Sequence, residues 1–192
     1  ALYFDMGREI PVDLNKTVAR VKNADVIVFA GGISPAVEGE EMHVNIPGFK
    51  GGDRETIELP SIQSRLLAEL KKAGKKVVFV NFSGSAIALT PETKTCDAIL
   101  QAWYPGQAGG TAIANVLFGD YNPAGRLPVT FYKSTSQLPG FEDYSMKGRT
   151  YRYMTEAPLF PFGHGLSYTT FRYGDASLNT QEVKDGEQTT LT

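Results

Sequence analysis

Short apolar runs alternate with amphipathic stretches along the first two thirds of the chain. The runs at residues 26–30, 77–82 and 98–103 are nearly continuous in apolar side chains, which is typical of strands buried on both faces of a parallel sheet. Residues 13–23 carry apolar positions at helical spacing behind Asp13, a suitable N-cap, and predict a short helix.

The amphipathic pattern is clearest over residues 61–73, where Ile62, Leu66, Leu67 and Leu70 form one apolar stripe and Gly74 follows as a helix stop. A second helix is expected over 109–118, and a short strand over 127–132. Strands that alternate with helices predict an α/β fold, in which helices cover both faces of a mostly parallel sheet. We therefore expect a three-layer α/β/α sandwich.

The pattern changes at residue 133, where helical periodicity ends and proline, glycine, tyrosine and phenylalanine become frequent. So many large side chains predict an ordered segment that covers the core, over residues 133–170. Residues 171–192 alternate like an edge strand followed by a second strand start. We expect a first domain at 1–170, with its core at 13–132, and a truncated β-sandwich start at 171–192.

Composition and charge exclude several classes of function. The 192 residues are 42% hydrophobic and 21% charged, with a net charge of −2, which leaves no basic surplus for a nucleic-acid partner. No apolar run is long enough to span a membrane, so no membrane partner is expected, and no signal peptide is visible. His43, His164 and Cys96 stand alone in the sequence, so no metal or cofactor site is predicted.

An acidic loop follows the first predicted strand, with Glu38, Glu40 and Glu41 within four residues. Ligands of open α/β sheets bind beyond the carboxyl ends of the strands, where this loop lies. A carboxylic acid that keeps its proton there could protonate a departing sugar oxygen. The alternative is a solvated acidic loop without a role in chemistry.

Two more stretches carry candidate contacts. Asp53 and Arg54 follow two glycines and could hydrogen-bond sugar hydroxyls, or instead lock the turn as an ion pair. Trp103 ends the third predicted strand and could stack on a sugar ring, or instead fill the core. The glycines after Trp103 do not fit a dinucleotide fingerprint, and no Walker motif is present.

Four stretches together resemble the C-terminal half of glycoside hydrolase family 3, the β-glucosidases and β-xylosidases. They are E-G-E-E-M at 38–42, G-G-D-R with L-P-S-I-Q soon after, W-Y-P-G-Q-A-G-G-T-A-I-A-N-V-L-F-G-D-Y-N-P-A-G-R-L-P-V-T-F, and P-F-G-H-G-L-S-Y-T-T-F-R-Y. The likeness covers about residues 20–173. The last two stretches are long and specific.

The resemblance implies an active site made of two parts. The family's first domain is a barrel that carries an aspartate nucleophile, and no counterpart of it occurs in this sequence. The second domain supplies the acid/base glutamate, often within E-x-E, here Glu38-Gly39-Glu40. Glu40 is the predicted acid/base, with Glu38 and Glu41 as alternatives because Glu41 stands where the family often has glycine. From Phe171 onward the chain is similar to the first strands of a fibronectin type III-like domain.

The function that follows is the acid/base-bearing half of a retaining exo-β-glycosidase, which frees terminal sugars from β-linked gluco- or xylo-oligosaccharides. The long loop looks more like that of xylan 1,4-β-xylosidases than that of β-glucosidases. Asp53, Arg54 and Trp103 are the predicted substrate contacts, and no cofactor is expected. The chain should need the missing barrel as its partner and be inactive alone. A periplasmic or secreted location is expected by analogy.

Two hypotheses from other classes stay open beside the enzyme. One is a non-catalytic carbohydrate-binding or structural module on the same fold. The other is a nucleotide-binding, flavodoxin-like domain, against which the missing phosphate fingerprint argues.

Overall fold

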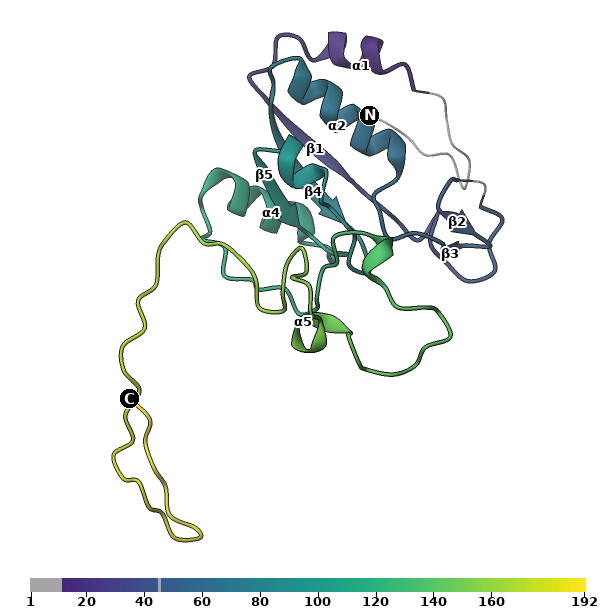
Figure 1. Cartoon of the computed structure of the whole chain (residues 1–192). Coiled ribbons are helices and arrows are strands. Elements are labelled where there is room, and N and C mark those ends of the chain that lie inside the picture. The colour runs from purple at the N-terminus through teal and green to yellow at the C-terminus, as the bar shows by residue number, and fades with distance from the viewer. Residues whose placement is uncertain (1–11, 45) are drawn as a thin grey trace.

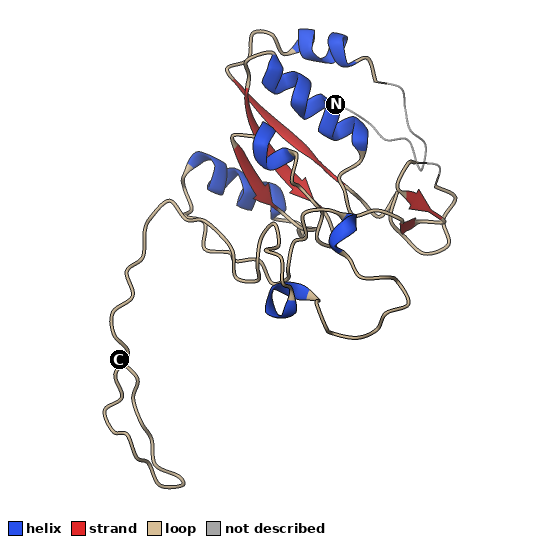
Figure 2. Cartoon of the chain, viewed as in Figure 1, coloured by secondary structure: helices blue, strands red, loops and turns tan. Residues whose placement is uncertain are grey.

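A parallel three-stranded sheet forms the centre of the computed structural model, which describes residues 12–44 and 46–192 (Figures 1 and 2). Its strands are β1 (Val26–Gly32), β4 (Lys76–Phe82) and β5 (Ala98–Gln101), in the order β1-β4-β5. The α/β class with a parallel sheet is thus confirmed. Residues 1–11 of the expected first domain lie outside the described residues.

One face of the sheet is covered by α2 (Ser61–Lys72), against which α1 (Leu14–Arg20) packs. The apolar stripe of α2 is buried as its spacing predicts, and Val77 and Phe79 of β4 beneath it have no exposed surface. Asp13 caps α1 by accepting the Lys16 N–H at 3.0 Å. These contacts make the main core of the domain.

The other face of the sheet is more open. Helix α4 (Gly109–Phe118) lies beyond β5 in Figure 1, and Gly109 is the one buried residue of this helix. Val26 and Val28 point outward from β1 and are 52% and 54% exposed. No other described strand pairs with the outer edge of β1. The second helical layer of the predicted sandwich is therefore thin here.

Three features differ from the sequence prediction. Residues 127–132 form no strand, because Pro128 lacks an N–H and Phe131 pairs only with Phe160 in a single bridge. The third strand ends at Gln101, since Trp103 has a φ of +56° and leaves the extended conformation. A short helix α3 (Glu92–Thr95) was not predicted.

The segment at 133–170 covers the core only in part. It contains η1 (Thr135–Gln137) and α5 (Thr150–Tyr153), and Phe160 packs against the buried Phe131. In contrast to the expectation that its large side chains are withdrawn from water, Phe141 and Tyr144 are 94% and 88% exposed. Tyr144 lies in a turn that Arg149 closes by donating to the carbonyls of residues 143 and 145, and Phe141 comes just before this turn.

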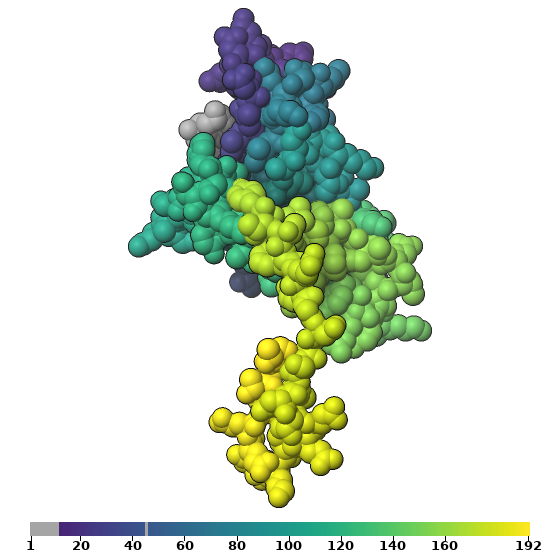
Figure 3. Space-filling view, turned by 90° about the vertical axis from the view of Figure 1, so that its left-hand side faces the viewer, coloured from purple at the N-terminus to yellow at the C-terminus, as the bar shows by residue number. Residues whose placement is uncertain are grey.

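Residues 171–192 extend away from the rest of the chain, as Figure 3 shows. Ser177 and Thr192 exchange two backbone hydrogen bonds, and Leu178 and Leu191 form an antiparallel bridge. No full strand results, because two short segments without a third strand or a core are marginal. Among the described residues, no helix has the length and apolar character to cross a bilayer.

Candidate functional site

The carboxyl ends of all three strands lie at one end of the sheet, and each leads into a loop. β1 continues into residues 33–48 and the hairpin of β2 (Phe49–Lys50) and β3 (Asp53–Arg54). β4 continues into residues 83–88, and β5 into residues 102–108. This is the end of an open parallel sheet where ligands bind.

The acidic loop leaves the sheet at Gly32, which has a φ of +121°. A Cβ atom at this position would lie 2.0 Å from the Phe82 carbonyl oxygen, so only glycine fits. The next residue, Ile33, donates its N–H to the same oxygen at 2.8 Å. Ile33 and Val37 are buried, which holds the loop's first turn against the core.

The far side of the loop is joined to the hairpin. Gly39 donates to the Gly52 carbonyl at 3.1 Å, and Met42 donates to the Gly51 carbonyl at 2.8 Å. A Cβ on Gly52 would come within 1.8 Å of the Gly39 oxygen, which explains the glycine pair before Asp53. The acidic loop and the hairpin therefore form one unit.

Glu38 and Arg54 form an ion pair inside this unit. The Glu38 Oε1 atom lies 3.9 Å from the Arg54 Nε atom, with 27% and 10% of the two side chains exposed. Arg54 also donates from Nε to the Thr56 carbonyl at 3.3 Å, and from Nη1 to Ser85 Oγ at 2.8 Å and the Ala86 carbonyl at 3.2 Å. Arg54 thus ties the hairpin to the loop after β4.

The Arg54 guanidinium is largely buried from solvent and has charged groups nearby. Burial lowers the pKa of the Arg54 guanidinium, while the charges of Glu38, Glu58 and Tyr104 act in the opposite direction. The Nη2 atom of Arg54 is buried and has no hydrogen-bond partner among the described residues. The Nε and Nη1 atoms of Arg54 donate within the protein, which gives Arg54 a turn-locking role, and its contact with a sugar stays a prediction.

Tyr104 completes the cluster and was not among the predicted site residues. Burial raises the pKa of its hydroxyl, and the nearby Glu38 charge adds to the rise. Its ring lies over Gly84, where a Cβ would approach the ring to 2.8 Å. The only sequence signal for Tyr104 was its place beside Trp103.

The remaining predicted residues are arranged differently. Glu40, Glu41 and Asp53 are exposed, and their carboxylates make no hydrogen bond or ion pair with another described residue. Glu41 has a φ of +49°, an uncommon conformation for a residue with a side chain. Trp103 is half-buried and turns its ring edge-on to Phe131 at 6.0 Å. The structure brings Glu38 and Arg54 together, and leaves Glu40, Glu41 and Asp53 at the rim.

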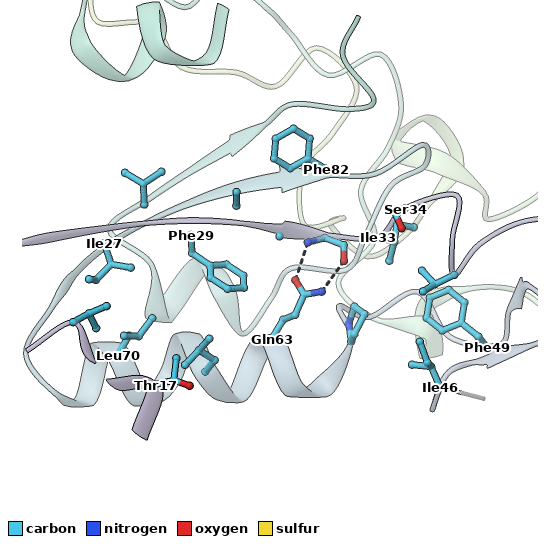
Figure 4. A pocket seen from close by; sticks show the side chains of 18 residues that line it. Thr17, Ile27, Phe29, Ile33, Ser34, Ile46, Phe49, Gln63, Leu70 and Phe82 are labelled. Carbon is cyan, nitrogen blue, oxygen red and sulfur yellow. Dashed lines mark hydrogen bonds between the residues drawn. The ribbon is translucent and has the colours of Figure 1, made fainter. Parts of the chain in front are cut away.

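A cavity of ≈ 570 Å³ lies beside this cluster but is not part of it (Figure 4). It runs between the outer edge of β1 and helices α1 and α2, with Ile27, Phe29, Leu66 and Leu70 among its mostly apolar lining. None of the predicted site residues lines it. Among the residues that the structure describes, no cluster of histidine, cysteine or acidic side chains is placed to hold a metal ion.

Comparison with protein families identifies the domain. Residues 9–168 match the family model of the glycosyl hydrolase family 3 C-terminal domain. The chain belongs to glycoside hydrolase family 3. A xylan 1,4-beta-xylosidase of Xylanibacter ruminicola is 63% identical over 93% of the chain, and a periplasmic beta-glucosidase of Salmonella typhimurium is 40% identical over 92%.

Solved family 3 structures share the fold. One is an exo-beta-xylosidase in complex with a xylobiose aziridine activity-based probe, with a TM-score of 0.71, 30% identity and 88% of the chain covered. Another is a Listeria innocua beta-glucosidase in complex with gluconolactone, with a TM-score of 0.66, 27% identity and 92% covered. The chain spans 21% to 24% of the length of these proteins.

Proposed function

We propose that this chain is the acid/base-bearing part of a retaining, exo-acting β-glycosidase that removes terminal xylosyl residues. The observation that carries the proposal is the loop of three carboxylates at the carboxyl end of the sheet, anchored by Arg54, in a family 3 domain. Glu40 and Glu41 are exposed and Glu38 keeps 27% of its side chain exposed, so each can reach a substrate held against another part of the enzyme.

The chemistry needs two carboxyl groups about 5–5.5 Å apart on either side of the glycosidic bond. One attacks the anomeric carbon while the other protonates the departing oxygen and later deprotonates the water that frees the sugar. We assign the second role to this chain. The nucleophile belongs to the rest of the enzyme, since the relatives are several times longer than the chain.

Glu38 and Glu40 are the two candidates for the proton donor. The E-x-E pattern favours Glu40, which is exposed and free to reach a substrate. The contacts favour Glu38, because its Oε1 atom lies 3.9 Å from Arg54 Nε and its side chain is 27% exposed, so its motion is more restricted than that of Glu40. A catalytic group that is held near its working position contributes more to the rate than a mobile, fully exposed one. We therefore place Glu38 ahead of Glu40 and Glu41.

The test uses the complete enzyme with Glu38→Gln, Glu40→Gln and Glu41→Gln in turn. Loss of the donor should lower kcat/KM for xylobiose about 100-fold or more, since general acid catalysis contributes roughly 10²–10⁴-fold. The value for a dinitrophenyl β-xyloside should change little, because this leaving group departs without a proton. If no variant shows this difference, the acid/base role does not lie in this loop.

The sugar is proposed from the relative that shares 63% of its residues, which is named for xylan 1,4-β-xylosidase activity. The 40% identical relative is named a β-glucosidase, so glucose is the alternative. Rates of the complete enzyme on nitrophenyl β-xyloside and β-glucoside decide between them. A higher kcat/KM on the glucoside would reverse the assignment.

The chain alone should not hydrolyse an aryl β-glycoside, because it lacks the nucleophile. Turnover by the 192-residue chain would instead place both carboxyl groups within it. Substrate binding without turnover in the complete protein would favour the non-catalytic module.

We further propose a periplasmic or secreted setting, in line with the periplasmic relative, and a fibronectin type III-like domain beginning near residue 171.

A further inference from the structure

Gln63 of α2 makes two hydrogen bonds to the backbone of a single residue, Gly32. Its Oε1 atom accepts the Gly32 N–H at 2.7 Å, and its Nε2 atom donates to the Gly32 carbonyl at 2.7 Å (Figure 4). Gln63 is only 2% exposed. A buried glutamine on the apolar face of a helix is costly unless both ends of its amide are satisfied, as they are here.

The two bonds satisfy the open edge of β1. In a parallel ladder, the N–H and C=O groups of one residue point to the same side, and successive residues alternate. Ile33 donates to Phe82 of β4, so Gly32 before it faces away from β4. The Gln63 carboxamide, with one donor and one acceptor, takes the place of a neighbouring strand for this one residue.

Gly32 is confined on its other sides as well. A Cβ there would meet the Phe82 carbonyl oxygen at 2.0 Å and Asn81 Oδ1 at 2.8 Å. A Cβ on Gly31 would lie 2.5 Å from Gln63 Oε1, so the preceding residue is also fitted to the glutamine. The backbone that begins the acidic loop is thereby fixed from both the helix and the sheet.

We propose that Gln63 is a positioning residue for the proton donor: by holding Gly32, it sets the direction in which the Glu38–Glu41 loop leaves the sheet. The proposal rests on the proposed function of that loop. The cluster of Glu38, Arg54 and Ser85 fixes the far side of the loop, and Gln63 fixes its origin. A small error at the origin displaces the carboxylates, and a 1 Å misplacement can cost about 100-fold in rate.

The experiment replaces Gln63 by methionine in the complete enzyme, which keeps the length of the side chain and removes both hydrogen bonds. We expect kcat/KM for xylobiose to fall about 10- to 100-fold, and that for dinitrophenyl β-xyloside to fall less than about threefold. The control is Leu70→Ala in the same helix, which opens a cavity in the core without touching Gly32. It should affect both substrates equally.

A second variant, Gln63→Leu, also removes both hydrogen bonds and buries no charge. It should change the two substrates in the same way, and it carries the test if the methionine variant does not fold. When the proton-donor glutamate has already been replaced by glutamine, adding Gln63→Met should not change the ratio of kcat/KM for xylobiose to kcat/KM for dinitrophenyl β-xyloside any further.

Equal losses on both substrates, or none, in the Gln63 variants would overturn the positioning role. That result is distinct from failure of the proposed function. In the latter case, the Glu38, Glu40 and Glu41 variants would themselves leave the substrate ratio unchanged.

Discussion

The acidic loop and its hairpin have an inner half and an outer half that differ in almost every contact. In the inner half, Gly32, Glu38 and Arg54 are held by hydrogen bonds, ion pairing or close packing. In the outer half, Glu40 and Asp53 are exposed, and their carboxylates make no hydrogen bond or ion pair with another described residue. The inner half is held by contacts within this chain, with Glu38 still 27% exposed, whereas the side chains of the outer half are free of such contacts.

The largest effect on stability is expected from Gly32→Ala. The added Cβ would overlap the Phe82 carbonyl oxygen at 2.0 Å, in a backbone conformation that side chains avoid. We expect a loss of about 3 kcal/mol or more in the free energy of unfolding. Urea unfolding of the chain followed by circular dichroism measures it.

Gly51→Ala is the matched change in the outer half. Gly51 has a φ of +61°, and nothing lies within 4 Å of the place that an added Cβ would take. The cost should be only the backbone strain, about 1–2 kcal/mol. Equal losses at Gly32 and Gly51 would contradict the distinction between the two halves.

Removal of Arg54 should have the next largest effect. Arg54→Ala deletes the hydrogen bonds to Thr56, Ser85 and Ala86, and the expected loss is about 2–4 kcal/mol. Its neighbour Asp53 is exposed, so Asp53→Ala should change the free energy of unfolding by no more than about 0.5 kcal/mol. Thermal unfolding of both variants provides the comparison. A larger loss of stability in Asp53→Ala than in Arg54→Ala would contradict this prediction.

A smaller, pH-dependent effect on the free energy of unfolding is expected from Glu92, a buried carboxyl group outside the candidate site. Burial raises its pKa, although Ser64 Oγ donates to Oε1 at 2.5 Å, and Oε2 has no partner among the described residues. Because the pKa is higher in the folded state, this group's contribution to stability is full below about pH 4.3, the usual value for glutamate, and falls as the pH rises through the folded pKa.

Glu92→Gln removes that titration. The stability of the variant relative to the parent chain should therefore increase from about pH 4 to about pH 7. Unfolding midpoints at several pH values measure the difference. A pH-independent difference would mean that Glu92 is not held at a raised pKa.

Local patterns predicted the elements well, because the stripe of α2 and the apolar run of β4 record burial directly. The similar run of β1 also forms a strand, although none of its residues is fully withdrawn from solvent. The patterns also placed the acidic loop at the correct end of the sheet. The local sequence patterns could not distinguish a turn-locking role of Arg54 from a sugar-binding role, since its partner Ser85 lies in a separate loop. Gln63 looked like one polar residue in an amphipathic helix, and only its contact with Gly32 gives it a role.

The most direct test of the acid/base assignment is rescue by azide of the Glu38→Ala variant of the complete enzyme, with Glu40→Ala beside it. Removal of the acid/base leaves room for azide to attack the glycosyl-enzyme on the face that water would use. With dinitrophenyl β-xyloside as substrate, we expect azide to accelerate the Glu38→Ala enzyme and to yield β-xylosyl azide. Rescue of Glu40→Ala alone would move the role to Glu40, and rescue of neither would contradict a proton donor in this part of the loop.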